Sequence, residues 1–159
     1  MAFNLNLDPR KVVSVFDGAI DHDHEDCDAG KYVAMDYPDD YASYLIFKEG
    51  ESPTIWEWEG LSFADRASIG RLNKAVQHVK KKEISVSISK ENQYVEAFAL
   101  GVKGWEGLSK DNNPLHYEQS KGRVHPRIMD FLAKAASKVV YEIGKLILEG
   151  SILDDEEKN

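Results

Sequence analysis

The acidic segment 21–28, with the sequence Asp-His-Asp-His-Glu-Asp-Cys-Asp, holds the residues of this chain best suited to chemistry. Carboxylate, imidazole and thiolate groups are the ligands of calcium and zinc sites. The spacing fits neither metal. In a calcium loop beginning at Asp21, the sixth position requires Gly but is Asp26, and the twelfth requires a bidentate Glu but is Tyr32. Zinc would need paired cysteines or two histidines one helical turn apart. We expect an acidic surface loop without a resident metal, with a divalent-metal site as the alternative.

The other candidates for acid–base or nucleophilic catalysis are dispersed along the chain. His78, His116 and His125 fall on separate expected elements, and Cys27 would point away from the two histidines of an extended segment 21–28. The sequence has no serine-centred elbow, phosphate-binding loop or dinucleotide fingerprint. It therefore predicts a non-enzymatic protein with no catalytic residues and no cofactor. A small metal-dependent enzyme that uses residues 21–28 is the hypothesis ranked last.

Composition indicates one globular domain of the cytoplasm. The chain has 159 residues, of which 42% are hydrophobic, with 3 Trp, 7 Tyr and 6 Phe, enough to build a core. A net charge of -8 argues against nucleic acid as a partner, because such binding depends on Lys and Arg neutralising phosphates. The single cysteine fits a reducing compartment. The first residues do not resemble a signal peptide, and no apolar run reaches the roughly 18 residues of a membrane helix, so no membrane partner is expected.

Charge is distributed unevenly between the two parts of the chain. Residues 1–60 contain 14 acidic and 4 basic residues, whereas residues 61–159 contain 14 acidic and 16 basic residues. Such asymmetry indicates two regions whose solvent-exposed surfaces differ in charge. We expect an α+β fold in which an acidic β-rich unit, residues 1–60, and a mainly helical part, residues 61–159, form one compact domain.

The first unit contains four segments typical of antiparallel strands. Alternation is clearest in the last of them, where Trp56 and Trp58 share one face. That face is either core or a site awaiting a partner, and we favour core. The expected strands are residues 11–16, 32–37, 44–48 and 54–59.

The helical part begins at a capping signal. Ser62 precedes Asp65 by three residues, as in a capping box, and an apolar stripe from Ile69 to Val79 follows. Residues 83–89 alternate between apolar residues and serine, which predicts an edge strand or an extended link. A second helix is expected from Ser89 to Gly101 or Gly104.

Trp105 is expected in a compact turn. Gly101, Gly104 and Gly107 punctuate this stretch, which also carries Leu108. The indole would either lock the turn onto the last helix or anchor a partner, because large aromatic residues do both. We favour the locking role.

One long amphipathic helix is expected from Pro126 to Gly150. Proline suits the first turn of a helix, and glycine can end a helix in the left-handed conformation. The apolar arc, which includes Phe131, is broad. Such a helix is either central to the core or in contact with a second copy of the chain, which makes a homo-oligomer the alternative.

The order of these features resembles phage and prophage proteins of the tail-gene region, described as tail assembly chaperones or tail accessory proteins. The resemblance lies in a tryptophan motif at residues 56–62, Gly-Trp-x-x-Leu at 104–108, an Asp-Asn-Asn-Pro loop at 111–114 and the tail 151–159. It covers residues 56–159. The chain departs from the pattern at Asn113, where Gly often occurs, and at the His-Tyr pair 116–117, and residues 1–50 have no counterpart.

The resemblance implies a protein-binding role during tail morphogenesis in the host cytoplasm. The partner would be a phage structural protein, such as the tape measure or tail tube protein, kept soluble until assembly. The alternative is a structural component of the virion: a tail, connector or decoration protein. The residues that we expect to bind the partner are Trp105, Leu108, Phe131, Trp56 and Trp58.

Overall fold

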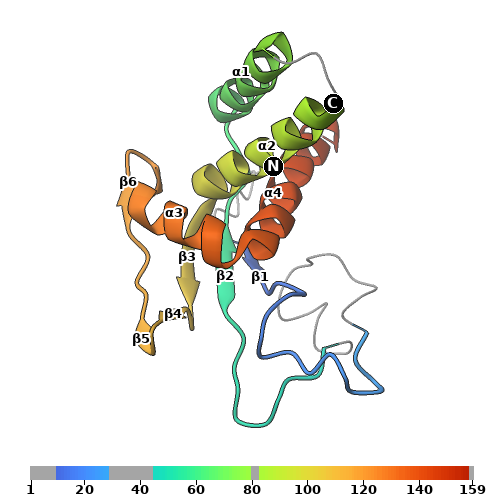
Figure 1. Ribbon diagram of the computed structural model, residues 1–159, viewed down its shortest axis with the longest axis vertical. Helices are drawn as coiled ribbons and strands as arrows, with labels where there is room; N and C mark the ends of the chain where they lie inside the picture. The colour runs from blue at the N-terminus through green and yellow to red at the C-terminus, as the bar shows by residue number, and fades with distance from the viewer. Residues whose placement is uncertain (1–9, 29–44, 80–82, 158–159) are drawn as a thin grey trace, which may run out of the picture.

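The computed structural model describes residues 10–28, 45–79 and 83–157, and within them the fold is α+β, as expected (Figure 1). A three-stranded antiparallel sheet packs with helices, and two short β-hairpins lie between the second and third helices. None of the helices in these residues is long and apolar enough to cross a membrane. The elements are β1 (Arg10–Val12), β2 (Ile55–Trp58), α1 (Phe63–Val79), α2 (Glu83–Gly101), β3 (Val102–Glu106), β4 (Ser109–Lys110), β5 (Asn113–Pro114), β6 (Gln119–Ser120), β7 (Arg123–Val124), α3 (Pro126–Ala135) and α4 (Ser137–Glu157).

The predicted N-terminal strands are confirmed in part. The expected strand 54–59 is β2, the central strand of the order β1-β2-β3, and its two tryptophans are buried. Of the expected strand 11–16, only the first residues pair with β2, because the chain turns at residues 14–17. The expected strand 44–48 contributes a single bridge between Phe47 and Ile20. The expected strand 32–37 lies outside the described residues.

The predicted compact turn around Trp105 is wrong, because most of that stretch forms β3. Helix α2 ends at Gly101, one of the two ends expected for this helix. β3 then pairs antiparallel with β2, and Trp105 lies opposite Trp56. Gly104 lies opposite Glu57, where a Cβ would come 2.9 Å from the Glu57 carboxylate. The pairing of this stretch with β2 is a long-range interaction that glycine spacing cannot distinguish from a turn.

Residues 83–89 form the first turns of α2, so the prediction of a strand or an extended link is wrong. Alternating β-branched residues favour a strand only when a neighbouring strand pairs with them. Here the segment precedes a helix held by packing, and extending an existing helix gains one hydrogen bond per residue fixed without a second nucleation cost.

The helix expected from Pro126 to Gly150 is two helices. The proline does start α3, but the chain breaks at Ala136 (φ -137°, ψ 44°) and α4 then continues past Gly150 to Glu157. Leu132 of α3 and Val140 of α4 are both buried in the same core cluster. Gly150 does not end a helix, and a Cβ added there would meet the Trp58 ring at 3.5 Å, an ordinary van der Waals distance.

The start of α1 follows the capping signal. The Ser62 hydroxyl oxygen accepts a hydrogen bond from the backbone N–H of Asp65 (3.1 Å). The apolar stripe is buried at Ile69, whereas Leu72 is exposed at its edge and Phe63 is 80% exposed. Figure 1 shows α1 at one end of the molecule, far from the β-hairpins.

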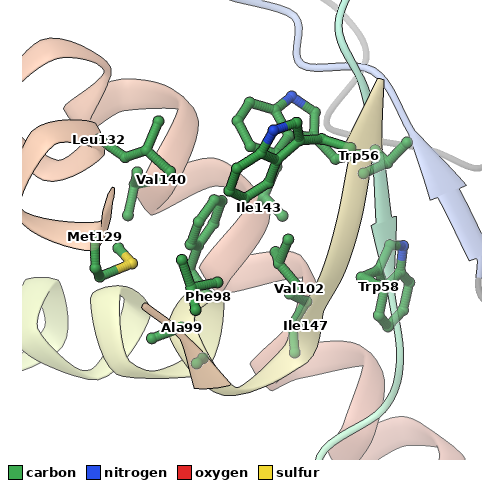
Figure 2. Close-up of a cluster of buried hydrophobic side chains, with 14 of the residues drawn as sticks. Trp56, Trp58, Phe98, Ala99, Val102, Met129, Leu132, Val140, Ile143 and Ile147 are labelled. Atoms are coloured by element: carbon green, nitrogen blue, oxygen red, sulfur yellow. The ribbon is translucent and has the colours of Figure 1, made fainter. Parts of the chain in front are cut away.

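One hydrophobic cluster joins the sheet and the helices. Trp56 contacts Phe98 of α2 and Trp105 edge-on, each at 5.5 Å between ring centroids. Figure 2 shows side chains from α2, α3 and α4 converging beside the sheet. The cluster also includes Val12 and Ile20 from the N-terminal residues, so both parts of the chain contribute to one core.

The helices α2 and α4 make the closest packing contact of the fold, and they run side by side in Figure 1. At Gly144 an added Cβ would lie 1.9 Å from the backbone carbonyl oxygen of Tyr94. No side chain can give way there, because the neighbouring atom belongs to the backbone of the facing helix. Gly144 therefore sets the distance between the two helices.

We predict that Gly144→Ala lowers the free energy of unfolding by about 3 kcal/mol, because the two helices must separate to admit a methyl group. Gly70→Ala is the control: that glycine is exposed on α1 with no atom near its added Cβ, and alanine there should stabilise by about 0.5–1 kcal/mol through helix propensity. Urea unfolding of both variants measures the difference. Equal stability of the two variants would contradict the close contact.

Candidate functional site

An open cavity of about 440 Å³ is the candidate functional site of the described residues. It lies between four segments far apart in the sequence: the loop after β1, the start of β2, Leu108 after β3, and the junction of α3 with α4. Its volume falls in the range of about 300–1,000 Å³ typical of ligand pockets. It is lined by Phe16, Asp17, Gly18, Thr54, Trp56, Leu108, Ala135, Ala136, Ser137, Lys138 and Val139.

The first wall of the cavity is a loop tied to α4 by Glu142. The fully buried Ser14 donates its hydroxyl hydrogen to one carboxylate oxygen of Glu142, and the backbone N–H of Val15 donates to the other (3.1 Å). The Ser14 hydroxyl oxygen in turn accepts from the backbone N–H of Phe16 (3.0 Å). The loop position therefore depends on one carboxylate that reaches it from the last helix.

Asp17 joins the same loop to the sheet. One carboxylate oxygen accepts from the backbone N–H of Ala19 and the other from that of Thr54, both at 2.9 Å. A carboxylate bonded in this way at both oxygens positions the backbone. Asp17 therefore fixes the loop to the start of β2.

The second wall is the junction between α3 and α4. The first hydrogen bond of α4 runs from the Val140 N–H to the Ala136 carbonyl, so the N–H groups of residues 137–139 have no acceptor within the helix. The Lys138 ammonium reaches the opposite wall and lies 5.7 Å from the centroid of the Phe16 ring. Phe16 is 49% exposed, which leaves an aromatic ring at the mouth of the cavity.

Two of the five expected partner-binding residues, Leu108 and Trp56, line the cavity. Leu108 lines the cavity half-buried, and Trp56 forms part of its lining although only 2% of its surface is exposed. Phe131 lies one helical turn before the lining residue Ala135, on the same face of α3, and the Lys110 ammonium sits 4.6 Å from its ring centroid.

Trp58 and Trp105 lie away from the cavity lining and belong to the core. Trp58 is 2% exposed, and the Arg10 guanidinium stacks on its ring at 5.1 Å from the centroid. The interpretation of the two-tryptophan face of β2 as core is therefore confirmed.

Trp105 locks the following hairpin segment onto the sheet. Its indole N–H donates to the Leu115 carbonyl (2.7 Å), and its ring packs edge-on against Tyr117 at 5.1 Å. The Tyr117 hydroxyl donates to the Val102 carbonyl (3.1 Å). Trp105 is buried, but the expected lock of a turn onto the last helix is wrong: its hydrogen bond and ring contact hold residues 115–117 against β3.

The acidic segment 21–28 is a loop, as expected, and residues 22–26 are exposed. Its side chains bond to nearby backbone: Asp21 accepts from the N–H of Asp23, His24 accepts from the N–H of Asp26, and His22 pairs with the Val15 carbonyl (2.8 Å). Across residues 10–28, 45–79 and 83–157, no group of three or more His, Cys, Asp or Glu side chains is placed to hold a metal ion.

The histidines take separate places. His116 is exposed, and His125 caps α3 by accepting a hydrogen bond from the Arg127 N–H (3.2 Å). Cys27 is half-buried and packs against the core. The side chain of His78 lies outside the described part of the structure.

Sequence reasoning missed Phe16, Asp17 and Lys138. The Asp-Gly pair at 17–18 signals a turn, but the second partner of Asp17, Thr54, is 37 residues away. Lys138 reaches the cavity only because the helix breaks at Ala136, a break that the sequence did not predict.

No protein-family model, curated protein or solved structure matches this chain.

We predict that Trp105→Phe lowers the free energy of unfolding by about 1–2 kcal/mol, because it leaves the partly buried Leu115 carbonyl without its donor. The control is His116→Ala, an exposed position between the two residues that Trp105 contacts, where the change should stay within about 0.5 kcal/mol. Urea unfolding tests both variants. A stable Trp105→Phe protein would show that the indole hydrogen bond holds nothing in place.

Tyr117 generates a prediction at alkaline pH. Burial, and secondarily the nearby Glu59 carboxylate, raise the pKa of the Tyr117 hydroxyl above its ordinary value of about 10. A raised pKa in the folded protein stabilises it below the unfolded pKa, and this contribution is lost as pH rises through the folded pKa. At pH 8, Tyr117→Phe should cost about 1 kcal/mol through the lost hydrogen bond to Val102.

Above pH 10 this difference between wild type and Tyr117→Phe should shrink, because only the wild type loses the contribution of this hydroxyl. Urea unfolding of both proteins from pH 8 to 11 measures the difference, in which the other tyrosines cancel. A difference independent of pH would contradict the assigned environment of Tyr117.

Proposed function

We propose that this protein is a non-enzymatic binding protein whose cavity between the Phe16 loop and the α3–α4 junction receives an apolar side chain of a protein partner. One observation carries the proposal: an open cavity lined by Leu108 and Val139 has a half-exposed phenylalanine, Phe16, at its mouth. Exposed aromatic residues beside apolar pockets are typical of protein interfaces.

The walls suit a binding role because hydrogen bonds hold them in place. Glu142 fixes the loop to α4 and Asp17 fixes it to β2, so the cavity does not have to be formed when a partner arrives. Preformed sites lose less conformational entropy on binding.

We place this binding in phage tail morphogenesis, with the protein acting as an assembly chaperone in the host cytoplasm. The partner would be a tail structural protein, such as the tape measure or tail tube protein. This setting rests on the sequence resemblance alone. Leu108, the last residue of the Gly-Trp-x-x-Leu motif in that resemblance, lines the cavity.

We predict that Phe16→Ser reduces recovery of tail protein at least about tenfold when the tagged chain is purified from infected cells, which corresponds to a loss of about 1.4 kcal/mol. Leu72→Ser is the matched control, since Leu72 is also an exposed apolar residue but lies on α1. Equal recovery of tail protein by the two variants would show that the cavity is not part of the binding surface.

The setting is tested by quantitative mass spectrometry of purified particles beside the infected-cell lysate. Presence in the lysate and absence from particles supports a chaperone that leaves after assembly. A fixed copy number in particles would identify a structural component of the virion instead. Recovery of no tail protein at all would overturn the phage setting.

A further inference from the structure

We infer that Glu142 and Ser14 are positioning residues of the proposed binding site, because together they set where Phe16 lies at the mouth of the cavity. This inference rests on the proposed function and adds how the site is held in its binding form. Neither residue is part of the cavity lining, so a partner in the cavity meets Phe16 and not the two side chains that position it.

Ser14 connects α4 to the backbone of Phe16. In the part of the chain whose side-chain burial is described, Ser14 is the only buried polar residue. Its hydroxyl hydrogen is donated to the Glu142 carboxylate, and its oxygen accepts the backbone N–H of Phe16 at 3.0 Å. A buried hydroxyl is costly unless its hydrogen bonds are made. The hydrogen bonds of Ser14 thus join the position of Phe16 to a side chain of the last helix.

The two hydrogen bonds from the loop to Glu142 require a carboxylate. The Ser14 hydroxyl donates to one oxygen of Glu142, and the Val15 N–H donates to the other (3.1 Å). An amide side chain has one oxygen that accepts and an NH2 group that only donates. In Glu142→Gln the NH2 group would face one of the two donors. The loop would then lose a hydrogen bond with little change in the volume of the side chain.

The Phe16 ring is held by the same helix. Lys138 lies one helical turn before Glu142 on α4, and its ammonium group is 5.7 Å from the centroid of the Phe16 ring. Phe16 is 49% exposed, although burial against the apolar lining at Leu108 and Val139 would be favourable for its ring. Burial of the ring does not by itself account for this position, whereas the hydrogen bonds through Ser14 fix the backbone there.

Amide hydrogen exchange of the full chain, followed by NMR, measures the positioning directly. In Glu142→Gln we expect the amides of Val15 and Phe16 to exchange at least about tenfold faster relative to Phe98, which is buried in α2 and reports global unfolding. Glu149→Gln is the matched control, because Glu149 is exposed on the same helix and the substitution removes the same charge. Unchanged relative exchange of Val15 and Phe16 in Glu142→Gln would show that Glu142 does not hold the loop, and would overturn the inference.

Ser14→Ala is a second variant that leaves Glu142 in place. It removes the acceptor of the Phe16 N–H but keeps the hydrogen bond from Val15 to Glu142. Exchange should therefore accelerate at least about tenfold at Phe16 and less at Val15. Equal acceleration at the two amides would show that the loop detaches as a whole, and would overturn the connection through Ser14. The NMR spectrum of each variant verifies its fold.

Recovery of tail protein from infected cells connects the positioning to binding. Glu142→Gln should lower recovery at least about threefold. The same substitution added to Phe16→Ser should lower it no further than Phe16→Ser alone, because Glu142 acts through Phe16. An equal loss in the two backgrounds would show that Glu142 acts independently of Phe16, and would overturn the inference.

The remaining outcomes separate this inference from the proposed function. Wild-type recovery by Glu142→Gln, together with a loss by Phe16→Ser, would overturn the inference and leave the proposed function standing. Wild-type recovery by Phe16→Ser would overturn both, because the position of Phe16 would then not matter for binding.

Discussion

The close approach of α2 and α4 is the constraint on which the rest of the structure depends. Glycine at position 144 lets the helix backbones meet at the Tyr94 carbonyl, so the distance between the helices cannot vary without a steric clash. Because β3 continues directly from α2, this contact also sets the place of the sheet relative to α4. Trp56 of the central strand then packs against Phe98 of α2, and one core results.

Two local features form the cavity: the break between α3 and α4 at Ala136 and the position of the loop after β1. The break at Ala136 turns α3 away from α4 and leaves the first turn of α4 facing the loop after β1. The loop cannot fold into the gap, because Glu142 and Asp17 hold it from two sides. Polar interactions thus keep an apolar surface open, which a purely hydrophobic collapse would have closed.

The net charge of the chain does not reveal where its charged residues lie relative to its exposed aromatic residues. The acidic residues gather in the N-terminal part, where segment 21–28 is exposed, while lysines stand over Phe16 and Phe131 beside the cavity. A negative net charge favours solubility. The lining of the cavity itself holds one cation, Lys138, and one carboxylate, Asp17.

The sequence by itself determined what depends on near neighbours. The Ser62 cap, the helix start at Pro126, the exposed acidic loop and the buried face of β2 all follow from residues a few positions apart. Most of the class of fold could therefore be predicted, as could the burial of the tryptophans.

Only the tertiary structure decided the partners of these elements. Glycine spacing around Trp105 could not show that this stretch pairs with β2, and alternation at 83–89 could not show that a packed helix would extend through it. Two cavity residues expected as binding residues, Leu108 and Trp56, were named from their type, but Phe16 and Lys138 meet only because the chain breaks at Ala136. Hydrogen bonds and packing between residues distant in sequence decide these features, and no local pattern encodes them.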